Sequence, residues 1–217
     1  MKKVVAFVVS LLIFKISSVG QLPFEKEIAE YKQQDSVNMP PKNAILFVGS
    51  SSIRLWKNAD EMFPDFTIIN RGFGGSTLLD LNRYLPDIVF PYEPKQIVIY
   101  SGENDFATAE ITPDELFSRF VNVYNLIRNR FSTVSIVYIS MKPSPSRDHQ
   151  RHLVIAANRR IRDFIRKKKN ASYVDVFTRM LNKEGKPKPE LFLADELHMN
   201  QQGYDIWKKA LLPYLKK

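Results

Sequence analysis

A short apolar run that ends in one glycine and three serines constrains the fold of this chain more than any other stretch. Residues 44–48 are all aliphatic or aromatic, which is typical of a strand buried on both faces of a sheet. Gly49 and residues 50–52 then end the run with small and polar side chains. A hydroxyl just past the carboxyl end of a buried strand lies where open α/β sheets place their active sites, but serines are also good helix N-caps. The run therefore predicts a central strand and leaves two interpretations of its serines, a helix cap and a catalytic hydroxyl.

Apolar runs and amphipathic stretches alternate along the rest of the chain. We expect further strands over residues 66–69, 96–101, 134–139 and 173–176, and helices over residues 24–34, from 77 toward 84, from 113 onward and from 201 onward. Thr112 is expected to cap one helix, with Glu115 completing a capping box, and Asn200 to cap the last helix. This alternation predicts an α/β fold, a three-layer α/β/α sandwich around a parallel sheet of about five strands. No linker interrupts residues 21–217, so they are expected to form a single domain.

The first twenty residues have the pattern of a secretory signal peptide. They begin with two lysines, continue through an apolar stretch over residues 4–14 that contains one polar residue, and offer Ser18 and Gly20 near a cleavage point. We therefore expect residues 1–20 to be removed on export to the periplasm or the cell exterior, with an uncleaved N-terminal anchor as the alternative. The apolar stretch is too short for a confident membrane span, so no stable span is expected after cleavage. The chain has no cysteine, which excludes disulfides and does not argue against export.

The formal net charge of +9 raises the question of a nucleic-acid partner. Many of the positive charges lie within residues 159–169. A nucleic-acid-binding patch is one interpretation of this cluster. However, Val154, Ala157, Ile161 and Phe164 recur at helical spacing, so a helix with a solvated basic outer face explains the charges better. Since no nucleic-acid motif accompanies the cluster, no nucleic-acid partner is expected.

Four polar clusters lie at positions where chemistry is expected. Three of them, at residues 49–51, 72–75 and 102–105, each follow a predicted strand, and the fourth, at residues 195–198, precedes the last helix. Because the carboxyl ends of parallel strands meet at one edge of a sheet, the first three clusters are expected to converge.

A serine nucleophile needs a base, and the base needs a group that orients it. Two of the three histidines, His149 and His152, lie beside arginines at the start of the basic helix and are expected to be exposed. His198 instead has Asp195 three residues before it, a spacing at which a carboxylate on a turn can reach the imidazole. An Asp-x-x-His pair on its own is more often a local polar contact.

The oxyanion of an acyl-transfer reaction needs hydrogen-bond donors. Gly75 can offer a backbone N–H, and Asn104 can offer a side-chain amide. The glycine-rich turn at residues 72–75 has a rival interpretation as a phosphate- or dinucleotide-binding loop, but it lacks the Gly-x-Gly-x-x-Gly spacing and the chain has no Walker lysine. Residues 49–53 also lack the second glycine of the α/β-hydrolase nucleophile elbow.

In their order and separation, the four clusters resemble the motif blocks of the SGNH, or GDSL-type, hydrolase superfamily. Gly49-Ser50-Ser51 stands where that superfamily has Gly-Asp-Ser, and residues 70–75, 102–105 and 195–198 resemble its second block, its Gly-x-Asn-Asp block and its Asp-x-x-His block. The small acetylhydrolase-like members, similar to the catalytic subunits of platelet-activating-factor acetylhydrolase, show the resemblance well. Ser50 departs from the usual aspartate, and aligning Gly49 with the family glycine selects Ser51 among the three adjacent serines.

The resemblance implies a flavodoxin-like fold and an acyl transfer that needs no metal and no other cofactor. It implies that Ser51, Asp195 and His198 are catalytic, and that the N–H groups of Ser51 and Gly75 and the amide of Asn104 bind the oxyanion. Five residues beside these blocks are candidates for substrate contact, although packing and surface charge explain each of them as well: Arg54, Trp56, Arg71, Phe73 and Glu103.

The expected function is that of an exported serine esterase that acts on small acyl esters. O-acetyl groups on carbohydrate are the candidate substrate, on the grounds of export and family habit alone. The alternative within the enzymes is a lysophospholipase or short-chain lipase, which the absence of a long apolar lid mildly disfavours. The alternative from another class is a non-catalytic carbohydrate- or surface-binding module on the same fold, which has no need of a Ser-His-Asp set. The acyl group, the alcohol part and the oligomeric state do not follow from the sequence.

Overall fold

Residues 22–217 are described in the structure, a computed structural model, and they form one five-stranded parallel sheet covered by helices. The strands are β1 (Ile45–Gly49), β2 (Ile68–Gly72), β3 (Gln96–Tyr100), β4 (Ser135–Ile139) and β5 (Ala171–Val174), in the spatial order β2-β1-β3-β4-β5. Every neighbouring pair is parallel. This is the flavodoxin-like strand order, so the predicted fold class is confirmed. The predicted signal peptide lies outside the described residues.

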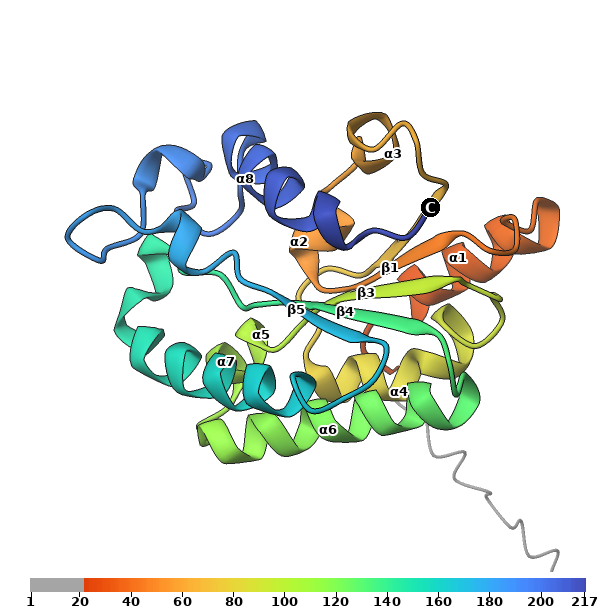
Figure 1. Ribbon diagram of the computed structural model, residues 1–217, viewed down its shortest axis with the longest axis horizontal. Coiled ribbons are helices and arrows are strands. Elements are labelled where there is room, and N and C mark those ends of the chain that lie inside the picture. The colour runs from red at the N-terminus through yellow and green to blue at the C-terminus, as the bar shows by residue number, and fades with distance from the viewer. Residues whose placement is uncertain (1–21) are drawn as a thin grey trace, which may run out of the picture.

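Helices cover both faces of the sheet (Figure 1). One face carries α1 (Glu25–Val37), α4 (Leu78–Ile88), α6 (Pro113–Arg130) and α7 (Arg151–Ile165), and the other carries α2 (Ser51–Arg54), α3 (Ala59–Met62) and α8 (Gln201–Leu211). The short helix α5 (Glu103–Thr108) follows β3 directly, and four 3₁₀ turns complete the fold: η1 (Pro145–Gln150), η2 (Thr178–Met180), η3 (Pro189–Leu191) and η4 (Leu212–Tyr214). No helix within residues 22–217 has both the length and the apolar character needed to cross a membrane.

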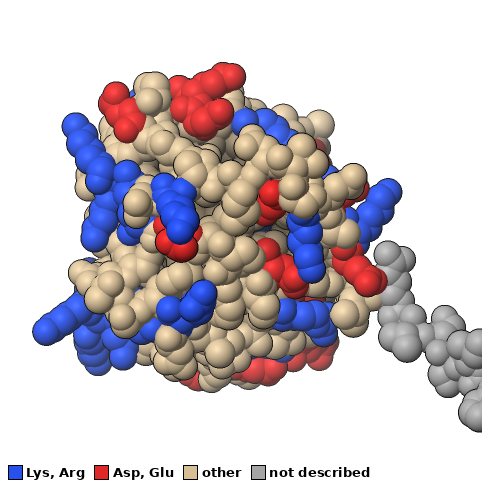
Figure 2. All heavy atoms as spheres, turned by 90° about the vertical axis from the view of Figure 1, so that its right-hand side faces the viewer, with Lys and Arg blue, Asp and Glu red and all other residues tan. Residues whose placement is uncertain are grey.

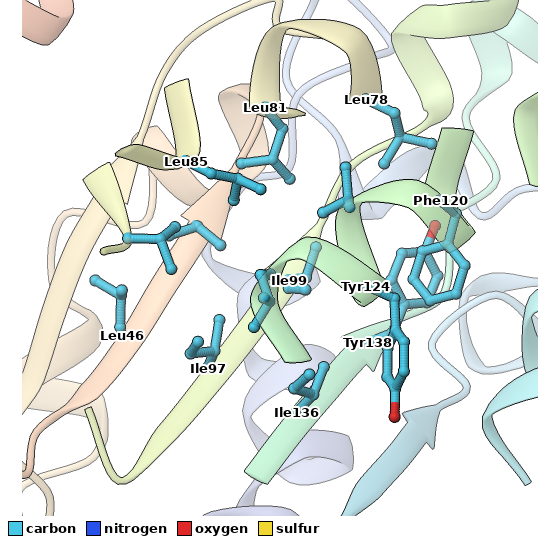
Figure 3. Packing of buried hydrophobic residues seen from close by; sticks show 14 of the residues in the cluster. Leu46, Leu78, Leu81, Leu85, Ile97, Ile99, Phe120, Tyr124, Ile136 and Tyr138 are labelled. Atoms are coloured by element: carbon cyan, nitrogen blue, oxygen red, sulfur yellow. The ribbon is translucent and has the colours of Figure 1, made fainter. Parts of the chain in front are cut away.

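The sheet separates two hydrophobic cores because successive side chains of a strand point to opposite faces. Leu46, Ile97 and Ile99 pack under α4 and α6, as Figure 3 shows, together with Leu81 and Phe120 from those helices. The alternate residues of the same strands, such as Phe47 and Tyr100, face α2, α3 and α8. There they join an aromatic cluster with residues from outside the sheet: Trp56, Phe63, Tyr204 and Trp207. Burial on both faces explains why the central strands are almost uninterrupted apolar runs.

Two predicted helix caps are present in the structure. The Thr112 hydroxyl accepts a hydrogen bond from the backbone N–H of Glu115 at the start of α6, and the Asn200 side chain accepts from two N–H groups of α8. The predicted capping box at α6 is only half formed, because the Glu115 carboxylate pairs with Arg119 instead. A complete box occurs at α4, between Thr77 and Asp80.

Strand β2 begins and ends later than predicted. It covers Ile68–Gly72, so Asn70, Arg71 and Gly72 belong to the strand and not to the turn. The reason is that both polar side chains have partners. The Asn70 side-chain amide donates 2.7 Å to the carbonyl of Ile53, and Arg71 pairs with Asp35 on α1. Strand β5 is also displaced, to Ala171–Val174, because its backbone pairs with β4 over that range.

Helix α7 confirms the interpretation of the basic cluster. Val154, Ala157 and Ile161 are buried against the sheet, while Phe164 is partly buried. Arg160 and Arg162 form ion pairs with Asp114 and Asp163. On the face shown in Figure 2, Lys and Arg side chains are interspersed with acidic and uncharged residues. The basic residues 159, 160 and 162 therefore lie on the outer side of a helix that packs on the sheet, and the basic residues 166–169 lie in the exposed turn that follows it.

Candidate active site

Ser51, His198 and Asp195 form a continuous hydrogen-bonded line. Ser51 is the first residue of α2 and is separated from the end of β1 by Ser50 alone, and its Oγ lies 3.1 Å from Nε2 of His198. Nδ1 of His198 lies 2.6 Å from Oδ2 of Asp195. A hydroxyl, an imidazole and a carboxylate in this order can transfer the hydroxyl proton to the imidazole while the carboxylate holds the ring.

The loop that carries His198 is fixed by its own backbone. Oδ1 of Asp195 accepts hydrogen bonds from the N–H groups of Leu197 and His198, at 3.0 and 2.9 Å. The N–H of Leu193 donates to the carbonyl of His198 at 2.8 Å, which closes the loop. Burial would raise the pKa of the Asp195 carboxyl, but the hydrogen bonds from the His198 ring and the two N–H groups outweigh it and lower the pKa to about 2. Asp195 therefore carries a negative charge throughout the pH range in which an imidazole titrates.

The position of Ser51 depends on a sharp turn at Gly49. Gly49 has φ +131°, and a Cβ there would lie 1.8 Å from the carbonyl oxygen of Tyr100 on the adjacent strand. The N–H of Ser50 donates 3.0 Å to that same carbonyl. Only glycine permits both the backbone conformation and the close approach. The turn places Ser51 past the carboxyl ends of β1 and β3.

The glycine-rich turn after β2 lies against the start of α2. The N–H of Phe73 donates 2.9 Å to the carbonyl of Gly49, and a Cβ on Gly72 would lie 2.4 Å from the backbone nitrogen of Arg54. Gly75 is exposed at the tip of the turn. Nδ2 of Asn104, at the start of α5, donates 3.0 Å to the carbonyl of Ser76 and so links this turn to the end of β3. The structure thus ties the segments of both candidate oxyanion donors, Gly75 and Asn104, together beside α2.

Two of the predicted substrate-binding residues belong to the hydrophobic cores, so those predictions were wrong. Trp56 is fully buried under α8, where it packs against Tyr204 and Trp207. Phe73 is fully buried on the other side of the sheet, against Tyr84. Proximity in sequence to a catalytic block did not indicate the direction in which either ring points.

The three charged candidates are engaged with protein partners. Arg71 is buried, and its guanidinium donates to Asp35 and to the hydroxyl of Tyr92, which leaves it a structural role. Glu103 is also buried and pairs with Lys142, so it lies behind the site and not in it. Arg54 is exposed and pairs with Glu27 of α1 at 2.6 Å, which keeps it at the surface beside Gly74.

A buried charged cluster that no sequence motif predicts lies next to Asn104. Nζ of Lys142 lies 3.0 and 2.9 Å from the two carboxylate oxygens of Glu103, and Nη1 of Arg147 lies 2.9 Å from Oδ1 of Asn104. Burial would raise the pKa of Glu103, but the nearby charges of Lys142 and Arg147 outweigh it and lower that pKa. Burial lowers the pKa of Lys142. Residues 142–144 are a loop that leads into η1, and this proline-containing stretch has no recognisable motif, so nothing in the local sequence marked these contacts.

The other two histidines of the chain lie at the surface. His149 and His152 are exposed, as predicted. Within residues 22–217, no group of three His, Asp or Glu side chains converges in a way that could hold a metal ion.

The family of the chain follows from its sequence as well as from this geometry. The GDSL-like Lipase/Acylhydrolase family matches residues 49–206, well over half of the chain, and the chain belongs to this family. The resemblance to GDSL-type hydrolases is therefore confirmed, and the protein is a serine hydrolase that acts on ester bonds. No curated protein matches it in sequence.

Solved structures share the fold. A protein of Streptococcus pneumonia, provisionally described as a platelet activating factor, is 22% identical with a TM-score of 0.77, over 88% of this chain and 92% of its own. A GDSL-like lipase of Bacteroides thetaiotaomicron is 21% identical with a TM-score of 0.73, over 86% of this chain and 96% of its own. An acetyl-xylooligosaccharide esterase of Geobacillus stearmophilus is 16% identical with a TM-score of 0.62, over 79% and 94%.

Proposed function

We propose that the protein is an exported serine esterase that hydrolyses small acyl esters, with O-acetyl groups on carbohydrate as the candidate substrate. The observation that carries this proposal is the hydrogen-bonded line from Ser51 through His198 to Asp195. Two further considerations support the finer points. The first twenty residues have a signal-peptide pattern, and an acetyl-xylooligosaccharide esterase is among the proteins with this fold.

In the proposed mechanism, Ser51 Oγ attacks the carbonyl carbon of the ester while Nε2 of His198 takes the hydroxyl proton. Asp195, ionised because of its low pKa, holds the ring through Nδ1 and stabilises the imidazolium. The N–H groups of Ser51 and Gly75 and the Asn104 amide would bind the negative oxygen of the tetrahedral intermediate. His198 then gives the proton to the departing alcohol, and water, activated by the same imidazole, cleaves the acyl-serine.

The substrate class can be tested with two sets of compounds. Among nitrophenyl esters of rising acyl length, turnover should be highest for the acetyl ester and fall with chain length. Among a panel of acetylated sugars, at least one should be deacetylated. Preference for long acyl chains or lysophospholipids would instead identify a lipase. A fluorophosphonate probe should label Ser51 in the folded protein, and the absence of both labelling and turnover would indicate a binding module. Sequencing the amino terminus of protein recovered outside the cytoplasm tests export and cleavage.

A further inference from the structure

The side-chain amide of Asn104 has a hydrogen-bond partner on each side, and the two partners together permit only one orientation of the amide. Nδ2 donates 3.0 Å to the carbonyl of Ser76, and Oδ1 accepts from Nη1 of Arg147 at 2.9 Å. A carbonyl oxygen can only accept a hydrogen bond, and a guanidinium can only donate one. If the amide were flipped, its oxygen would face the Ser76 carbonyl and its NH₂ would face the guanidinium, so both contacts would become repulsive.

We propose that Arg147 is a positioning residue for the esterase reaction, which it serves by orienting and polarising the oxyanion-binding amide of Asn104. This inference rests on the proposed function of the same site. The Asn104 NH₂ group has two hydrogens, of which one is used by Ser76. With the orientation fixed, the second hydrogen remains available to the oxyanion of the intermediate, and no reorganisation is needed when that charge develops.

The contact also strengthens Asn104 as a donor. Asn104 is 7% exposed, so little water weakens the interaction between its oxygen and the guanidinium. A hydrogen bond from a cation to an amide oxygen withdraws electron density from the amide, and hydrogen bonds in such a chain reinforce one another. The N–H bond on the far side of the amide consequently becomes a better donor to a negative oxygen.

The charged cluster behind Asn104 holds Arg147 in place. Nη1 of Arg147 lies 3.4 Å from Oε1 of Glu103, whose carboxylate also pairs with Lys142 and accepts from the Tyr100 hydroxyl. Two basic side chains therefore share one carboxylate beside the amide, which limits the movement of the Arg147 guanidinium.

The segment that carries Arg147 also contacts the loop of the catalytic histidine. The N–H and the hydroxyl of Ser146 both donate to the carbonyl of Glu196, at 3.2 and 3.0 Å. Glu196 has φ +56° and lies between Asp195 and His198. Two neighbouring residues of η1 thus hold the two halves of the site: Ser146 binds the loop of the catalytic histidine, and Arg147 binds the oxyanion amide. The distance between the two halves is therefore fixed by this one turn.

A double-mutant cycle tests the proposal. Removing an oxyanion donor costs about 10²- to 10³-fold in turnover, and Arg147→Ala, which leaves the donor present but unoriented, should lower kcat roughly 10- to 100-fold with KM changed less than about threefold. In the Asn104→Ala background the same change should cost less than about threefold, because a residue that acts only through Asn104 has nothing left to orient. Arg147→Lys, which keeps one charged donor, should recover part of the loss.

Arg151 provides a matched control on the same surface. Its guanidinium contacts Asp148 and the carbonyl of Gly185, away from Asn104. Arg151→Ala should keep kcat within about threefold of the unmodified protein, since surface substitutions away from a site have small effects. The proposal is wrong if the fold-losses in kcat of Arg147→Ala and Asn104→Ala multiply in the double variant. It is also wrong if Arg147→Ala raises KM and leaves kcat unchanged. In either case Arg147 acts on the substrate or on the fold.

A second measurement does not depend on catalysis. The side-chain amide signals of Asn104 in a ¹⁵N-correlated NMR spectrum, identified by their loss in Asn104→Ala, should shift in Arg147→Ala and remain in place in Arg151→Ala. An unshifted Asn104 signal in Arg147→Ala would overturn the proposal. Failure of the proposed function looks different, because the unmodified protein would then neither react with fluorophosphonate nor hydrolyse esters.

Discussion

The two sides of the candidate site are built in opposite ways. The histidine side consists of consecutive residues in an exposed loop, where the side chains of Asp195 and His198 are 48% and 27% exposed. The oxyanion side is assembled from distant segments, and the side chains of Glu103 and Lys142 are only 6% and 1% exposed. A carboxylate at the surface keeps part of its hydration and needs few partners, whereas buried charges must be paired. The carboxylate of the first side should therefore contribute little to the stability of the fold, whereas the buried Glu103–Lys142 pair of the second side should contribute much.

The largest effect is expected at Ser51, where the two sides meet. Ser51→Ala should lower ester turnover by about 10⁴-fold or more, because the nucleophile is gone. Ser50→Ala and Ser52→Ala should retain most of the activity, since neither hydroxyl is bonded to His198. Hydrolysis of a short nitrophenyl ester measures all three. If Ser50→Ala or Ser52→Ala is inactive while Ser51→Ala turns over normally, the nucleophile is the neighbouring serine.

Asp195→Asn tests the exposed side of the comparison. It should lower kcat by up to about 10⁴-fold, because an amide cannot stabilise the imidazolium and favours the wrong tautomer of His198. The midpoint of thermal unfolding should move by only about 1–2 °C, as for other surface changes. Glu196→Gln, a similar change in the same loop, should leave both quantities nearly unaltered. A large fall in the unfolding temperature of Asp195→Asn would contradict the separation of function from stability.

Lys142→Met tests the buried side. It removes the principal partner of Glu103 and should lower the free energy of unfolding by about 3–5 kcal/mol, as measured by urea denaturation. The matched control is Lys42→Met, because Lys42 forms an exposed ion pair with Glu93 at 2.8 Å. Its cost should be below about 1 kcal/mol. Equal costs for the two lysines would show that burial does not distinguish the two pairs.

The smallest effect concerns acid pH. The folded protein lowers the pKa of Asp195 from 3.8 to about 2 and lowers the pKa of Glu103 from 4.5, so both groups favour folding when ionised. Their contribution is complete above about pH 5 and is lost as pH falls through the lowered pKa values. Burial raises the pKa of Asp105, so protonation of Asp105 offsets part of this loss. Urea denaturation between pH 5 and 2 should show a shallower decline for Asp195→Asn, and an identical decline would mean that Asp195 contributes nothing to acid stability.

The sequence allowed the sheet and the histidine side to be predicted because their signals are local. Apolar runs identified the strands, polar caps identified the starts of α6 and α8, and the Asp195–His198 contact spans three residues. Strand β2 was displaced because Asn70 and Arg71 found partners elsewhere in the chain. A pattern read over a few neighbouring residues does not show which distant residues will pair with them.

The oxyanion side could be predicted only as far as Asn104. Lys142 and Arg147 contact Glu103 and Asn104 across 39 and 43 residues of sequence. A lysine and an arginine in a proline-containing loop are ordinarily solvated, and only the folded arrangement shows that they are not. Trp56 and Phe73 were misassigned for a related reason, since the face on which a side chain lies depends on the packing of its segment.

The turn at Gly49 limits how this site can be redesigned. A side chain at position 49 would overlap the carbonyl of Tyr100, so no rotamer choice or neighbouring side-chain change makes room for it. A combinatorial library over residues 49–54 should therefore return glycine at position 49 in every active clone. Arg54, which is exposed and pairs with Glu27 at the surface, is the position in that stretch where diversity should be tolerated without moving the nucleophile.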